Sequence, residues 1–230
     1  MARYTEQELR YLRLLDELQE TGGVDVHYEE RGEIEELMGE APAAFALIEE
    51  WQGVRFAAEL QRAFLRFAGI SAHWTLTKGA STLYGEFSLR HLAAALFATG
   101  ETLVHEDLPA DVRALYEEFR VFDEQPRTGA GTLAALRVPS MATETISPEV
   151  WYYDSSDGAV RLDVDYAQYL DALLVTKGTL GWQYLFADVD LGESGLGGVA
   201  DDLRTMLDVF PELFPSEDYS DLRARLEARL

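Results

Sequence analysis

The sequence predicts an α+β fold in which a mixed β-sheet is flanked by helices, with extra helices at both termini. Helical patterns of unequal length alternate irregularly with a few short strand patterns, unlike the regular repeat of a parallel α/β sheet. Residues 154–158 have the composition of a tight turn between two strand patterns, which indicates a β-hairpin. Hydrophobic residues make up 47% of the 230 positions, including 11 Phe, 11 Tyr and 4 Trp, which is enough for a substantial core.

The first helix is predicted over residues 5–20. Thr5 and Glu8 have the spacing of a capping box, and leucines recur at helical spacing along the segment. Two glycines, at 22 and 23, end the pattern. The stretch that follows, 29–40, holds six glutamates against a single Arg31, and we interpret it as a helix or a loop at the surface.

Further elements are predicted from periodicity and from start and stop residues. Helices are expected over 42–51, 57–67, 89–98, 109–119, 165–175 and 199–210, with a last helix capped by Ser216. Strands are expected over 70–77, 84–87, 132–138, 150–153 and 160–162. The glycine-containing segments 125–131 and 192–198 are interpreted as exposed loops. No linker separates these elements into independent domains.

The charge of the chain restricts its partners. The formal net charge is −23 and the isoelectric point is about 4.4. Such a field repels phosphate backbones and anionic lipid headgroups, and it attracts basic proteins. We therefore expect no nucleic-acid partner and no membrane partner. A surface that is acidic only for solubility is an equally good interpretation of the charge alone.

The composition also limits the available chemistry. The chain has no cysteine, which excludes disulfides, thiolate nucleophiles and cysteine-based zinc sites, and which fits a reducing compartment. The first residues are not followed by the apolar segment of a signal peptide, and no apolar run is long enough to span a bilayer. A cytoplasmic location is expected.

Patterns that could bind a cofactor or a metal are weak. Residues 195–200 fit the spacing of a dinucleotide-binding loop, but too little chain follows, and the neighbouring Glu193 and Asp201 would repel a phosphate. The acids of 154–158 lack the spacing of a calcium loop. The four histidines show no metal-binding spacing; they are His27, His73, His91 and His105. We therefore expect no catalytic residues, no cofactor and no metal.

Three stretches of the chain resemble one known family. Residues 59–69 read ELQRAFLRFAG and precede Trp74, residues 85–89 read GEFSL, and residues 150–174 begin with VWYY and end in a leucine pair. In this order they are similar to three parts of the SMI1/KNR4 family, also called the SUKH superfamily. These parts are the helix before its first strand, a strand-to-helix step, and a late hairpin with the helix that follows.

The resemblance implies one domain over residues 1–230, with a core at about 42–176 and helical extensions at both ends. It also implies a binding role, since bacterial members are mostly immunity proteins that neutralise toxins, and fungal relatives act as scaffolds. The family shares no catalytic set of residues. No functional residue is therefore carried over to this chain.

Charge and resemblance together predict a non-catalytic protein-binding domain, namely an immunity protein that binds a basic toxin domain such as a nuclease. A nuclease carries basic groups for its phosphate contacts, and an acidic inhibitor competes for those groups. A scaffold or regulatory domain in a larger assembly is the alternative. The predicted partner-binding residues are Glu29, Glu30, Glu33, Glu36, Asp188, Asp190 and Glu193.

Overall fold

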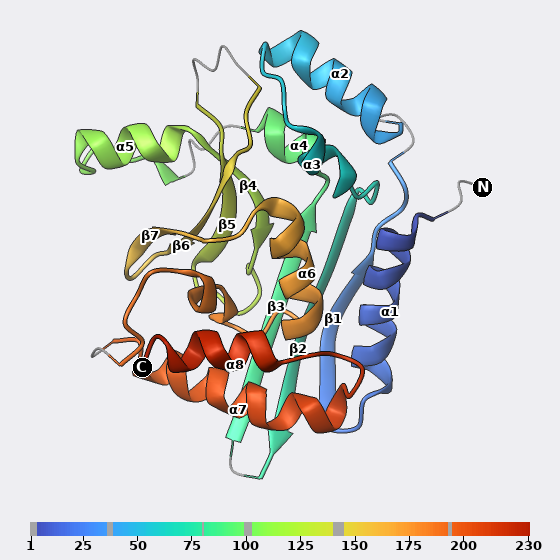
Figure 1. Ribbon diagram of the computed structural model, residues 1–230, viewed down its shortest axis with the longest axis vertical. Helices are drawn as coiled ribbons and strands as arrows, with labels where there is room; N and C mark the ends of the chain where they lie inside the picture. Colours follow the sequence, from blue (N-terminus) through green and yellow to red (C-terminus); the bar gives the residue numbers. More distant parts are fainter. Residues whose placement is uncertain (1–3, 36–38, 80, 99–102, 140–144, 193–194) are drawn as a thin grey trace.

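The fold is built on one seven-stranded sheet (Figure 1). The computed structural model describes residues 4–35, 39–79, 81–98, 103–139, 145–192 and 195–230. The strands lie in the order in which they occur in the chain, and each pair of neighbours is antiparallel. Short connections favour this arrangement for the β2–β3, β4–β5 and β6–β7 pairs, because a tight hairpin can join only antiparallel strands.

The strands are β1 (Val24–Arg31), β2 (Gly69–Lys78), β3 (Ser81–Arg90), β4 (Phe119–Glu124), β5 (Thr132–Arg137), β6 (Glu149–Asp154) and β7 (Gly158–Arg161). The helices are α1 (Glu6–Glu20), α2 (Ala41–Gln52), α3 (Ala58–Arg62), α4 (Leu92–Phe97), α5 (Ala110–Glu117), α6 (Tyr166–Thr176), α7 (Gly197–Leu213) and α8 (Ser220–Glu227). A 3₁₀ helix, η2 (Trp182–Phe186), follows α6. The predicted α+β class is confirmed. The sheet itself is antiparallel and not mixed, since parallel pairing among the described residues is limited to an isolated bridge between Phe56 and Ile146.

The main core lies between one face of the sheet and helices α1, α6 and α7. The Trp74 ring of β2 packs against Phe210 of α7, with 6.2 Å between ring centroids. The Tyr11 hydroxyl of α1 donates to the Leu170 carbonyl of α6 over 2.9 Å, which ties the two helices together. Trp74 lies across Gly85 of β3, where an added Cβ would come within 2.1 Å of the indole. Only glycine leaves room for that ring.

A smaller core lies on the opposite face of β4, β5 and β6, under α5. Alternation along β6 produces both cores, because Tyr152 faces the main core and Trp151 and Tyr153 face the smaller one. Tyr116 of α5 packs edge-on against Tyr153, with 5.6 Å between ring centroids. Tyr152 of this hairpin is therefore a core residue, and Trp151 and Tyr153 are half-buried against the smaller core.

Elements with strong local signals are confirmed. The Thr5 hydroxyl accepts from the Glu8 N–H over 3.2 Å, and the Glu8 carboxylate accepts from the Thr5 N–H over 2.7 Å, so the predicted capping box of α1 is present. Gly53, with φ of 69°, ends α2 as expected. Residues 155–157 form the turn of the predicted hairpin between β6 and β7.

Several predicted elements are wrong. The start of the acidic stretch is not helix or loop but strand β1, because β2 supplies backbone partners for it. The helix predicted over 89–98 begins only at Leu92, because β3 continues to Arg90. Within β3, the Ser88 N–H donates to the Asp123 carboxylate over 2.8 Å. Strand β4 was not expected, and the segment 125–131 is not wholly exposed, since Gln125 is buried.

Several helix boundaries also differ; α7, for example, begins at Gly197 and runs through Pro211 to Leu213. Two other differences have a visible cause. The helix predicted over 57–67 ends at Arg62, because the Arg66 N–H donates to the Glu8 carboxylate over 3.0 Å and not to a helical carbonyl. The last helix begins at Ser220 and not after Ser216, and the Asp218 carboxylate accepts from the Ser220 N–H over 2.9 Å. Both differences arise from side-chain contacts that periodicity does not reveal.

Candidate functional site

The two predicted acids on β1 point to opposite faces of the sheet. Glu29 faces α1, where it accepts from Arg31 and from Gln19, and Arg31 is also paired with Asp16 at 2.7 Å. Glu30 faces the other side and accepts from the Tyr28 hydroxyl over 3.2 Å. A strand alternates its side chains, so adjacent acids cannot share one patch.

The remaining predicted acids do not join them. Glu33 is exposed beyond the end of β1. Asp188 and Asp190 are exposed in the segment before α7, which is tied to the C-terminus by a 2.8 Å bond from the Leu191 N–H to the Arg229 carbonyl. That segment and β1 lie on opposite sides of the molecule (Figure 1). Glu36 and Glu193 lie outside the described residues.

A groove between α6 and α8 has the properties that a recognition surface needs. Its volume is about 280 Å³, and it opens to solvent. Apolar side chains from three elements form its floor, and carboxylates stand at its edge. The apolar lining residues are Val164, Ala172, Val175, Phe186 and Leu222, and the polar ones are Gln168, Asp171, Asp218, Asp221 and Arg225.

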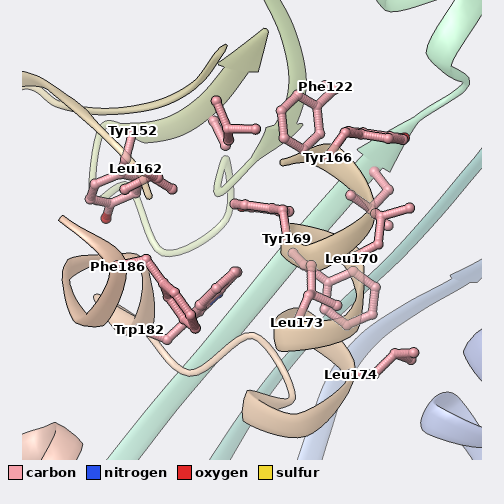
Figure 2. Packing of buried hydrophobic residues seen from close by; sticks show 14 of the residues in the cluster. Phe122, Tyr152, Leu162, Tyr166, Tyr169, Leu170, Leu173, Leu174, Trp182 and Phe186 are labelled. Carbon is pink, nitrogen blue, oxygen red and sulfur yellow. The ribbon is translucent and has the colours of Figure 1, made fainter. Parts of the chain in front are cut away.

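The helical repeat of α6 explains how the floor is built. The face of α6 that enters the core carries Tyr169, Leu170, Leu173 and Leu174, which are fully or almost fully buried (Figure 2). Gln168, Ala172 and Val175 recur three and four positions apart, so they line up on a different face. That face is half exposed and borders the groove. On this second face the helix therefore presents two half-exposed apolar side chains, Ala172 and Val175, beside the polar Gln168.

The rim of the groove is anionic. Arg225 pairs with Asp163 at 2.9 Å and with Asp221 at 2.8 Å, and its guanidinium lies 4.4 Å from the centroid of the Phe186 ring. Asp171 pairs with Arg10 at 2.6 Å. Four carboxylates against two guanidinium groups leave a formal charge of −2 once Asp218 is counted.

Asp218 is the rim carboxylate that has no ion pair among the described residues. The backbone N–H and the hydroxyl of Ser220 hold the pKa of Asp218 below its usual value. Its side chain is exposed at the turn that leads into α8. Asp218 is therefore ionised at neutral pH and available to a cation from outside.

Over the rest of the described surface, most cationic side chains already have a carboxylate or carbonyl partner. Both lysines pair with carboxylates of the chain, Lys78 with Glu212 and Lys177 with Glu17 and Glu217. Most of the described arginines are also in ion pairs or bonded to backbone carbonyls. The surplus charge of −23 is consequently carried by carboxylates at the surface.

A buried carboxylate, Asp123, lies inside the main core. It accepts from the Ser88 N–H and from the Tyr169 hydroxyl, each over 2.8 Å, and Gln183 donates to the same hydroxyl over 3.2 Å. Burial raises the pKa of Asp123 to about 7, and the two hydrogen bonds oppose that shift. Figure 2 shows Tyr169 and Trp182 close together in this region. With 1% of its surface exposed, Asp123 is out of reach of a ligand in this conformation.

The histidines are placed as follows. His27 and His73 lie on the open face of β1 and β2, with 5.2 Å between ring centroids, and the His27 Nε2 contacts the Thr75 hydroxyl at 2.9 Å. Burial lowers the pKa of His91, against the opposing charge of Glu35. Within the described ranges, no three side chains of the metal-binding types gather closely enough to hold a metal ion.

The comparisons with known proteins add no relative. No family model matches the chain, and neither the curated proteins nor the solved structures include a match. The resemblance to the SUKH superfamily therefore stays a prediction. In the described part of the chain, no helix has the length and apolar character needed to cross a membrane.

One pattern in the sequence points to the groove. Residues 165–175 are predicted to form a helix, and its residues Ala172 and Val175 lie off the buried face, where polar side chains are the norm. Phe186 and Leu222 come from distant parts of the chain. They lie beside α6 because of tertiary packing, which no local pattern encodes.

Proposed function

We propose that this chain is a non-catalytic protein-binding domain that recognises a basic protein. Following the resemblance, the partner is a toxin domain, and binding neutralises it. The observation that carries the proposal is the groove between α6 and α8, because it combines an apolar floor with carboxylates at its edge. Protein recognition surfaces combine a desolvated apolar centre with a polar rim in the same way.

Electrostatics supports a basic partner in particular. A surplus of −23 steers a positively charged protein toward the chain and speeds its association, whereas a second acidic protein is repelled. A nuclease toxin meets this requirement, since its substrate channel has to be basic. Capture of that channel by carboxylates would block the substrate.

The test uses the product of the gene that neighbours the gene of this chain. Purified toxin domain and purified chain are mixed, and the association rate is measured at several salt concentrations. We expect a fast association that slows as salt rises, because screening weakens charge steering. Failure to bind at any salt concentration contradicts a neutralising role, and stable binding to a housekeeping assembly instead indicates a scaffold.

Charge reversal decides whether the predicted acids outside the groove take part. Glu33→Lys and Asp188→Lys change two exposed residues at separate places. If these places face the partner, the double variant associates more slowly and with a flatter salt dependence than the unaltered chain. An unchanged rate and salt dependence would remove both segments from the binding surface.

A further inference from the structure

We infer that the groove between α6 and α8 takes an amphipathic basic helix of the partner, with apolar side chains on the floor and Lys or Arg at the carboxylate rim. This inference rests on the proposed protein-binding function and specifies its occupant. Three features of the groove carry it: shape, apolar lining and charge.

The shape and lining suit a helix. Gln168, Ala172 and Val175 run along one side of α6 for about two turns, roughly 10 Å. Leu222, from α8, stands across from them, and Phe186 lies at the floor. Two helices that flank an apolar channel offer the ridges and grooves into which a third helix packs. A helix inserted there would anchor side chains spaced three and four residues apart.

The charge selects a basic helix over an acidic or neutral one. The rim has a formal charge of −2, and Asp218 is left without a cationic partner in the part of the chain that is described. Arg225 shows what the rim accepts, because its guanidinium is held between two carboxylates and the face of Phe186. An arginine or lysine of the partner would meet the carboxylate of Asp218, and next to it that of Asp171, which is shared with Arg10.

The experiment uses a designed probe. This is a labelled peptide of about 18 residues built from leucine and lysine, with the leucines three and four apart so that they form one helical face. A second peptide has glutamate in place of lysine, and a third has the first composition in scrambled order. Fluorescence anisotropy measures the binding of each peptide to the full chain. Only the first peptide is expected to bind, and circular dichroism should show that it becomes helical.

Two variants place the binding in the groove. Ala172→Leu fills part of the floor and should weaken binding of the peptide roughly tenfold or more. Asp218→Asn removes one rim charge while keeping an acceptor for Ser220, and should weaken binding roughly 1.5- to 5-fold. Each has a matched control outside the groove, Ala114→Leu and Asp111→Asn, both exposed on α5, and both controls should bind like the unaltered chain.

The outcomes separate this inference from the proposed function. Equal binding of the scrambled peptide, or equal weakening by Asp111→Asn and Asp218→Asn, overturns the inference and indicates only a diffuse acidic coat. If the toxin domain binds Ala172→Leu and the unaltered chain equally, the groove is not the site, although the binding function stands. If the peptide enters the groove and the toxin domain does not bind, the proposed neutralising role fails and the groove inference survives.

Discussion

At the scale of single residues, Asp123 is the clearest case of a group whose chemistry is set by its surroundings. Burial in the main core raises the pKa of Asp123 to about 7, well above the ordinary value of an aspartate, despite the bonds from Ser88 and Tyr169. A folded-state pKa above the unfolded one means that the folded state binds the proton more tightly. The contribution of Asp123 to stability is therefore fully present below about pH 4 and is lost as the pH rises through about 7.

The variant Asp123→Asn should remove this dependence. Asparagine keeps an acceptor for Ser88 and carries no charge to bury. The free energy of unfolding of the variant, relative to the unaltered chain, should rise between pH 4 and pH 8 by at most about 4 kcal/mol. Urea unfolding at several pH values measures it. The exposed Asp188→Asn is the control, and parallel curves for Asp123→Asn and the unaltered chain would show that Asp123 is not the group responsible.

At the scale of elements, a buried ion pair joins α1 to the segment between α3 and β2. The Arg66 guanidinium donates to both oxygens of Glu8, over 2.8 and 2.7 Å, and Glu8 is fully buried. Burial raises the pKa of Glu8, but the bonds from Arg66 and Thr5 outweigh it, so the pKa is lowered overall. This part of the stability is therefore present at neutral pH and is lost as the pH falls below the ordinary range of a glutamate.

Removing only the arginine of this pair should lower the free energy of unfolding more than removing both charges. Arg66→Met leaves the Glu8 carboxylate buried without its cation, and should lower the free energy of unfolding by roughly 3 to 5 kcal/mol. The double variant Glu8→Gln with Arg66→Met should be less destabilised than Arg66→Met alone. Urea unfolding of both variants measures the difference. Equal losses would mean that the buried charge is not the cause.

The same elements show how far local patterns reach. The capping boxes of α1 and α6 and the turn before β7 depend on residues close in sequence, and each was predictable. Strand β1 was not, since its pairing with β2 lies some forty residues away. The last two residues of β3 were predicted to be helical. They extend a strand in which the Ser88 N–H donates to the Asp123 carboxylate, and these two residues meet only in the folded chain.

At the scale of the whole molecule, the groove between α6 and α8 is where the net charge of −23 can contribute to binding. The acids that the sequence singled out are spread over separate faces, with Glu29 turned toward α1 and Asp188 near the C-terminus. Composition predicted the sign of the surface charge. It did not predict where on that surface the apolar groove would lie. The groove between α6 and α8 is assembled from residues up to about sixty positions apart, so only the fold could reveal it.

Neutralisation of a basic toxin domain is the central proposal, and a growth assay tests it most directly. A toxin domain encoded by a gene next to that of this chain would be expressed in a host that it inhibits, alone or together with this chain. Growth should return with the unaltered chain and with Ala114→Leu, and should not return with Ala172→Leu, all three present at equal soluble levels. Persistent growth inhibition beside abundant, folded, unaltered chain would contradict the proposal.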